Sequence, residues 1–234
     1  MGSKFDFVDQ ELARRRQTGQ LRRLRTLESR GGTEVCADGR ALLNFSSNDY
    51  LGLASHPLLR SRAAEFTDRF GTGATSSRLV CGSNPGFDRV ESTLAQLKQT
   101  AKALVLNSGY QANISLVPAL ADRRSLILID RCCHSSLIQG AVLSRCRMQR
   151  YRHGDLDHLR DLLSGSAETE YSRRIIVTES VFSMDGDQSD IATLVGIAEE
   201  FDALLVVDEA HATGVLGARG MGLTCGHAVD LCIG

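Results

Sequence analysis

The chain has 234 residues, a formal net charge of -1 at pH 7 and 5% aromatic residues. Its near-neutral charge gives no electrostatic case for nucleic-acid binding, although basic residues cluster near the N-terminus. No apolar run approaches the roughly 18 residues that a membrane span needs, and residues 1–10 lack a signal-peptide core. We therefore expect a cytoplasmic protein that is long enough to bury a sizeable core.

The seven cysteines are scattered and contain no C-x-x-C pair, so the sequence indicates neither a disulfide framework nor a zinc site. Cys132, Cys133 and His134 are adjacent, but neighbouring ligands in a short loop rarely close a tetrahedral site. We expect reduced, mostly structural thiols and no metal.

The first 45 residues differ in pattern from the rest. Residues 5–30 predict a charged helical stretch with sparse leucines, an arm rather than a core helix. Two short strands at 33–36 and 41–45 flank Asp38-Gly39, a turn signal typical of a hairpin. We assign residues 1–45 to this arm and hairpin, and 46–234 to one large domain.

From Lys102 onward, apolar strands alternate with helical periods. The predicted strands are 103–106, 126–129, 148–151, 175–178, 204–207 and 229–233, and the predicted helices are 111–120, 137–144, 156–163 and 191–201. This alternation predicts an α/β fold whose mostly parallel sheet is covered by helices on both faces. The glycine-rich run at 71–78 follows a helical pattern without a preceding strand, so we reject it as a dinucleotide fingerprint.

Asp208 ends the apolar run 204–207, which is typical of a central parallel strand. An unpaired carboxylate there costs several kcal/mol, so we expect Asp208 to face a cation or a bound polar ligand. In open α/β sheets, ligands bind at the edge where the carboxyl ends of the strands lie.

Three other predicted strand ends also offer polar groups. Ser108, Gly109 and Tyr110 open a helix, where backbone N–H groups could hold a phosphate; taken alone, a plain serine cap is the favoured alternative. The ring of His134 could stack on a flat ligand, or cap and pack its helix. Ser183 lies in a segment whose Asp and Gly residues are explained by turn formation alone, without a functional role.

Together these four strand ends describe one crevice. It suits a flat, phosphorylated, basic ring such as pyridoxal 5'-phosphate (PLP). Asp208 would keep the pyridine nitrogen protonated, and His211 could bond the phenolic oxygen.

Four segments of the chain resemble the α-oxoamine synthases, a family of PLP enzymes: NFSSNDYLGL (44–53), SGYQAN (108–113), TESVFSMDGD (178–187) and DEAHATG (208–214). The resemblance covers nearly the whole chain. It implies the large domain of a fold-type-I PLP-dependent transferase, and a homodimer whose active sites lie at the subunit interface.

The resemblance also assigns roles to residues. Gly109 and Tyr110 would hold the cofactor phosphate, and His134 would stack on the ring. Ser183 and His211 would lie near the phenolic oxygen, and Asp208 would pair with the ring nitrogen. The positions that match substrate contacts are Asn48 and Arg22; for Arg22 a solvated basic helix face remains an alternative.

The reaction that the resemblance implies is condensation of an amino acid with an acyl-CoA thioester and loss of CO₂, giving an aminoketone. Pimeloyl-CoA, or its carrier-protein analogue, with L-alanine is the preferred pair; glycine or serine with another CoA thioester is the alternative. His134, Asp208 and His211 are the expected catalytic residues.

The family's chemistry begins on a lysine that binds the cofactor covalently. Lys4, Lys98 and Lys102 are the only lysines, and none lies in the family's lysine motif. We expect that lysine, with the small domain, beyond Gly234. The chain is then either a fragment of a complete enzyme or a naturally short, non-catalytic or degenerate protein, and we expect it to be inactive alone.

Overall fold

The computed structural model describes residues 3–29 and 33–234. The chain divides into two compact units, Met1–Gly71 and Thr72–Gly234. The boundary that we placed after residue 45 stays a prediction.

Within its described residues, the first unit holds two helices and a small antiparallel sheet. Its helices are α1 (Asp6–Gln17) and α2 (Pro57–Phe70), with a 3₁₀ turn at Leu53–Ser55. The sheet has the order β1 (Glu28–Ser29), β2 (Glu34–Ala37), β3 (Arg40–Leu43). Asp38 and Gly39 join β2 to β3 with φ of 51° and 75°, the left-handed pair that a type I′ turn requires, so the predicted hairpin is confirmed.

The predicted helix over 5–30 is wrong beyond Gln17. Thr18 caps the end of α1, and Gly19 then takes a φ of 69°, which an α-helix does not allow. Residue 30 lies outside the described residues.

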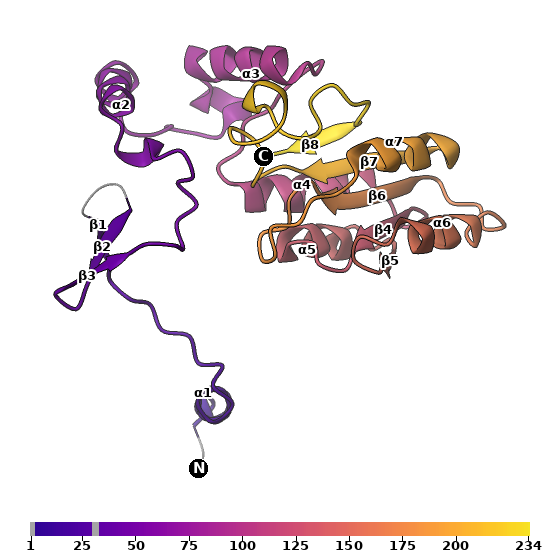
Figure 1. Ribbon diagram of the computed structural model, residues 1–234, viewed down its shortest axis with the longest axis horizontal. Coiled ribbons are helices and arrows are strands. Elements are labelled where there is room, and N and C mark those ends of the chain that lie inside the picture. The colour runs from indigo at the N-terminus through magenta and orange to yellow at the C-terminus, as the bar shows by residue number, and fades with distance from the viewer. Residues whose placement is uncertain (1–2, 30–32) are drawn as a thin grey trace. The chain divides into compact units, whose positions relative to one another are not determined.

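A five-stranded, wholly parallel sheet organises the second unit (Figure 1). Its strands lie in the order β5-β4-β6-β7-β8, which confirms the predicted α/β architecture. Their bounds are β4 Leu126–Asp130, β5 Arg147–Tyr151, β6 Arg174–Glu179, β7 Ala203–Asp208 and β8 Leu231–Ile233. The carboxyl ends of all five strands therefore meet at one edge.

Helices cover both faces of this sheet, as predicted. In β4, Leu126 and Leu128 pack into one core cluster and Ile127 and Ile129 into the other, so the strand is buried on both sides. Helices α6 (Leu156–Ser164) and α7 (Ile191–Glu200) contribute to the first cluster, and α4 (Gly109–Leu120) and α5 (Ser135–Leu143) to the second. A Cβ on Gly140 would lie 2.7 Å from the Asn113 carbonyl oxygen, so only glycine lets α5 approach α4 this closely.

The predicted strand at 103–106 is wrong, because its backbone is bound by side chains instead of a neighbouring strand. The N–H of Val105 donates to Glu91 of α3 (Pro85–Lys98) at 2.7 Å. Arg78, in the π-helical segment Arg78–Gly82, donates to the Val105 carbonyl at 2.9 Å and pairs with Glu91 at 2.6 Å. These two side chains replace the ladder hydrogen bonds that a strand would need.

The glycine-rich run follows α2 in the sequence, with no strand directly before it, as we expected. Among the helices of residues 3–29 and 33–234, none combines the length and the apolar character needed to cross a bilayer.

Candidate active site

Asp208 is the last residue of β7 and is 6% exposed. Its Oδ2 accepts from the Asn113 amide at 2.8 Å, and its Oδ1 accepts from the Ala210 N–H at 2.9 Å. Within the described ranges Asp208 forms no ion pair, and each of its oxygens retains a second lone pair. A buried carboxylate with only neutral partners is suited to accept a cationic N–H.

A hydrogen-bonded chain connects Asp208 to His134. The Asn113 amide nitrogen also donates to the Ser136 hydroxyl at 2.9 Å, and that hydroxyl lies 2.6 Å from Nδ1 of His134. His134 also caps α5, because its Nδ1 accepts from the Ser136 N–H at 3.3 Å. The predicted capping role is therefore observed, and the same ring is linked to Asp208 through Ser136 and Asn113.

Asn113 and Ser136 are site residues that we did not predict. Asn113 stands four residues after Gly109, so both lie on the same face of α4, and this spacing could have identified it. Its Oδ1 is buried without a partner in the part of the chain that the structure describes.

Carboxylates crowd the same edge of the sheet. Glu179, the last residue of β6, is 4% exposed and accepts from the backbone N–H of His134. Burial raises the pKa of Glu179 to about 7, and the nearby charges of Asp208, Asp130 and Asp187 add to this rise. The hydrogen bond from His134 acts in the opposite direction. This excess of buried negative charge favours a ligand that carries positive charge.

The N-terminus of α4 offers an anion site. Ser108 Oγ accepts from the Gln111 N–H at 3.1 Å, so the predicted serine cap is present. Gly109 and Tyr110 occupy the first turn, where backbone N–H groups have no intrahelical acceptor. No atom lies within 4 Å of where a Cβ on Gly109 would stand, so an anion can approach these donors and the positive end of the helix.

Ser183 and His211 lie in the turns that follow β6 and β7. The Ser180 N–H donates to the Asp208 carbonyl at 2.8 Å, which fixes the start of the Ser183 segment beside β7. His211 is three residues after Asp208, in a turn closed by the Ala212 N–H on the Glu209 carbonyl at 2.9 Å.

Arg22 and Asn48 belong to the first unit, and both are exposed. Asn48 Oδ1 accepts from the Tyr50 hydroxyl at 3.5 Å. Their predicted role in substrate binding stays a prediction.

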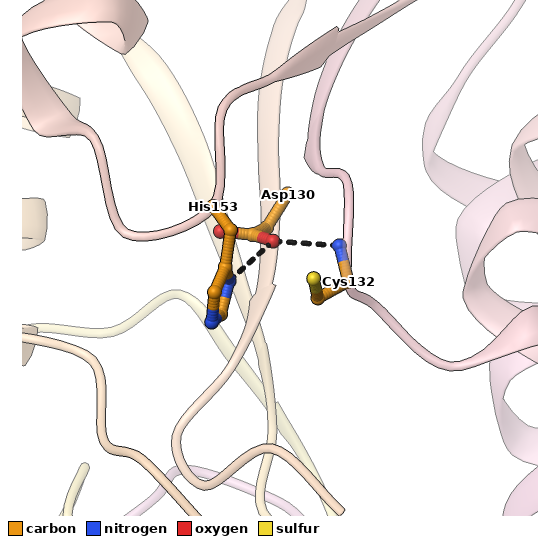
Figure 2. Close-up of side chains that lie close together, drawn as sticks. All are labelled: Asp130, Cys132 and His153. Atoms are coloured by element: carbon orange, nitrogen blue, oxygen red, sulfur yellow. Dashed lines mark hydrogen bonds and ion pairs between the residues drawn. The ribbon is translucent and has the colours of Figure 1, made fainter. Parts of the chain in front are cut away.

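Figure 2 shows a second group of polar side chains, Asp130, Cys132 and His153, whose donor atoms lie within 4.8 Å of one another. Asp130 Oδ1 accepts from the Cys132 N–H at 2.8 Å and from His153 Nδ1 at 2.9 Å (Figure 2). Asp130 Oδ2 accepts from the Gly154 N–H at 3.0 Å, and His153 Nε2 pairs with Asp187 at 2.8 Å. Because hydrogen bonds already engage both Asp130 oxygens and both His153 nitrogens, we assign no metal to this group.

Cys133 does not join His134 in a cluster. Its thiol is buried and donates to the Val177 carbonyl at 3.8 Å. Burial raises the pKa of this thiol well above its ordinary value, which is the behaviour of a structural cysteine.

The family model for aminotransferase class I and II matches residues 40–230. The chain belongs to this family. A relative from Desulfosudis oleivorans is 58% identical over 99% of the chain, which covers 60% of that relative. An 8-amino-7-oxononanoate synthase from Geotalea daltonii is 46% identical over 95% of the chain, which covers 55% of it. The chain thus spans somewhat more than half the length of these family members.

Solved structures of family members match the fold. A serine palmitoyltransferase from Sphingomonas wittichii superposes with a TM-score of 0.83 at 30% identity, over 95% of this chain and 56% of its own. One from S. paucimobilis with PLP and myriocin bound gives a TM-score of 0.83 at 26% identity, over 97% of this chain and 57% of its own. These relatives confirm the resemblance to the α-oxoamine synthases and the fold-type-I large domain.

The cofactor of this family is PLP, as predicted, and the residues present fit it. Asp208 supplies a buried carboxylate that no cationic side chain of residues 3–29 and 33–234 pairs with, which matches a pyridinium nitrogen. The first turn of α4 supplies unpaired N–H groups and open space, which match a phosphate. The cationic ring nitrogen would also offset the charge that raises the pKa of Glu179.

Proposed function

We propose that this protein is an 8-amino-7-oxononanoate synthase, which condenses L-alanine with pimeloyl-CoA and releases CO₂ and CoA. The proposal concerns a protein of the relatives' length, because the chain covers 60% and 55% of two of them. The observation that carries it is the buried Asp208 carboxylate at the edge where the strands end, whose hydrogen-bond donors among the described residues are all neutral.

When bound, PLP supplies an electron sink that stabilises a carbanion on the amino-acid substrate. Asp208 keeps the proton on the pyridine nitrogen, because a buried anion favours the cationic form of a group beside it. Asn113 holds the Asp208 carboxylate in place through its 2.8 Å hydrogen bond.

The other predicted residues orient the cofactor. Gly109 and Tyr110 would bind the phosphate through their backbone N–H groups. His134 would pack its ring on the cofactor ring, with its orientation fixed by Ser136 at 2.6 Å.

Ser183 and His211, each in the turn that follows its strand, would donate hydrogen bonds to the phenolic oxygen. We also propose that Arg22 and Asn48 contact the substrate, that the protein acts as a homodimer, and that it is cytoplasmic.

Cofactor binding to the 234-residue chain tests the proposed site without turnover. We expect Asp208→Asn to weaken non-covalent PLP binding by about 30-fold or more, because the loss of one partner of a buried charge pair costs about 2 to 5 kcal/mol. Equilibrium dialysis measures the affinity, and Asp157→Asn, which removes an exposed carboxylate on α6, is the matched control. Equal affinity of the wild type and Asp208→Asn would overturn the role of Asp208.

Substrate choice is tested by thiol release in the protein of the relatives' length. We expect CoA release with L-alanine and pimeloyl-CoA, and little with L-serine or glycine and palmitoyl-CoA. Identities of 46% to a synthase of this name and 30% to a serine palmitoyltransferase support this order. Faster release with L-serine and palmitoyl-CoA would replace the proposed substrates with those of the sister activity.

A further inference from the structure

The segment that carries Ser183 is a tight loop whose Phe182 side chain packs into a core cluster of the sheet. Residues 180–189 fold back on themselves: Val181 and Gln188 form an isolated antiparallel bridge, and the Phe182 N–H donates to the Asp187 carbonyl at 3.0 Å. The Gly186 N–H donates to the Phe182 carbonyl at 2.9 Å, so the turn encloses Ser183. Asp187 lies on the exposed side of this turn, so a contact to its side chain would hold that side in place.

His153 provides such a hold from a different element. It follows β5, and its ring edge packs on Phe182 with ring centroids 4.5 Å apart and planes at 87°. Its Nε2 lies 2.8 Å from the Asp187 carboxylate in the loop, and its Nδ1 lies 2.9 Å from the Asp130 carboxylate at the end of β4. One ring thus joins the rigid sheet to both sides of the Ser183 turn.

This geometry requires a proton on both ring nitrogens of His153. A neutral imidazole has one N–H and one bare nitrogen, whereas both nitrogens of His153 face carboxylate oxygens. Only the imidazolium donates to both carboxylates; in the neutral ring, one nitrogen lone pair would face a carboxylate lone pair.

We propose that protonated His153 is a positioning residue that holds the Ser183 loop against the end of β4, so that the loop is released as His153 loses its proton. This inference rests on the proposed function only for the role of Ser183. The hold itself is a property of the Asp130, His153 and Asp187 side chains.

The charges around His153 favour the imidazolium. Burial lowers its pKa, but the hydrogen bonds and charges of Asp130 and Asp187 outweigh burial, so the pKa is raised above its ordinary value. Other titratable groups near this cluster include the Cys132 thiol, beside Asp130, and Glu179, at the end of the adjacent β6. The charge of Asp130 also contributes to the raised pKa values of the buried Cys133 and Tyr151. Because the folded-state pKa is raised, the hold is complete at low pH and is lost as pH rises through that pKa.

Asp187→Asn tests whether the hydrogen bonds of His153 depend on its being protonated. With asparagine at 187, a neutral His153 donates from Nδ1 to Asp130 and accepts an amide N–H at Nε2, so both hydrogen bonds persist without a charge. His153→Phe keeps a ring against Phe182 but removes both hydrogen bonds. The two variants therefore predict different pH behaviour.

Amide exchange of Phe182 and Gly186 measures the hold directly. After correction for intrinsic exchange, we expect wild-type protection to fall about tenfold between pH 6 and pH 8.5, because a hydrogen bond to a charged group is lost. We expect Asp187→Asn to be equally protected at both pH values, and His153→Phe to be poorly protected at both. His227→Gln, at an exposed histidine, is the control that should keep the wild-type pH dependence.

Wild-type protection that does not change with pH, or an Asp187→Asn variant that keeps the wild-type pH dependence, would overturn the inference. PLP affinity at the same two pH values gives an independent second measurement. If no variant binds PLP, the proposed function fails, while amide exchange still decides whether His153 holds the loop.

Discussion

Glu179→Gln tests the electrostatics of the sheet edge. Burial and three neighbouring carboxylates raise the pKa of Glu179 from 4.5 to about 7. Since the folded-state pKa is the higher one, the folded state binds more protons in this range, and stability is lost as pH rises through about 7. The glutamine side chain of the variant could still accept from the His134 N–H but carries no charge, so the substitution removes this loss.

The magnitude follows from the two pKa values. Each pKa unit corresponds to about 1.4 kcal/mol, so the full penalty is about 3 kcal/mol, most of which develops between pH 5 and pH 8. Urea denaturation at both pH values measures the free energy of unfolding. We expect the advantage of Glu179→Gln over the wild type to grow by about 2 to 3 kcal/mol from pH 5 to pH 8.

Other groups titrate in the same range, but they cancel in the difference between the two proteins. Glu170→Gln is the matched control, because this exposed carboxylate remains in water when the chain folds. An equal difference between Glu179→Gln and the wild type at both pH values would refute this electrostatic account.

Three further predictions follow from the contacts. Lys98→Met should lower the free energy of unfolding by about 3 to 5 kcal/mol in urea titrations, because it leaves the buried Glu209 carboxylate, which Lys98 contacts at 2.9 Å, without its cationic partner. A loss below about 1 kcal/mol would contradict this. Ser108→Ala should cost about 1 kcal/mol by the same measurement, through loss of the cap on Gln111, and no change would exclude that cap. Borohydride reduction of the 234-residue chain with PLP should give no stoichiometric adduct at a single lysine by mass spectrometry, since Lys98 is held in its ion pair; a site-specific adduct would contradict this.

The sheet was predictable because its signal is local. Continuous apolar runs between helical periods marked β4, β6 and β7 to within a residue or two of their observed bounds. A strand buried on both faces needs apolar residues at every position, so this pattern is difficult to confuse with an amphipathic element.

The errors arose where contacts between residues distant in sequence, or a local backbone conformation, override the periodic pattern. Residues 103–106 have the composition of a strand, but Arg78 and Glu91 bind the backbone of Val105. The arm was predicted as one helix to residue 30, but Gly19 adopts a left-handed φ that ends it. Neither the ion pair nor the choice of backbone conformation can be read from periodicity.

The sequence by itself determined the residue types at the carboxyl edge: a carboxylate that ends β7 and an imidazole that follows β4, and it also placed a serine and glycine at the start of α4. Parallel strands must align the ends of β7 and β4. The tertiary structure decided which groups touch. Asn113 reaches Asp208 across 95 residues of sequence, and His153 joins Asp130 to Asp187, because packing of helices and loops against the sheet sets distances that no local pattern encodes.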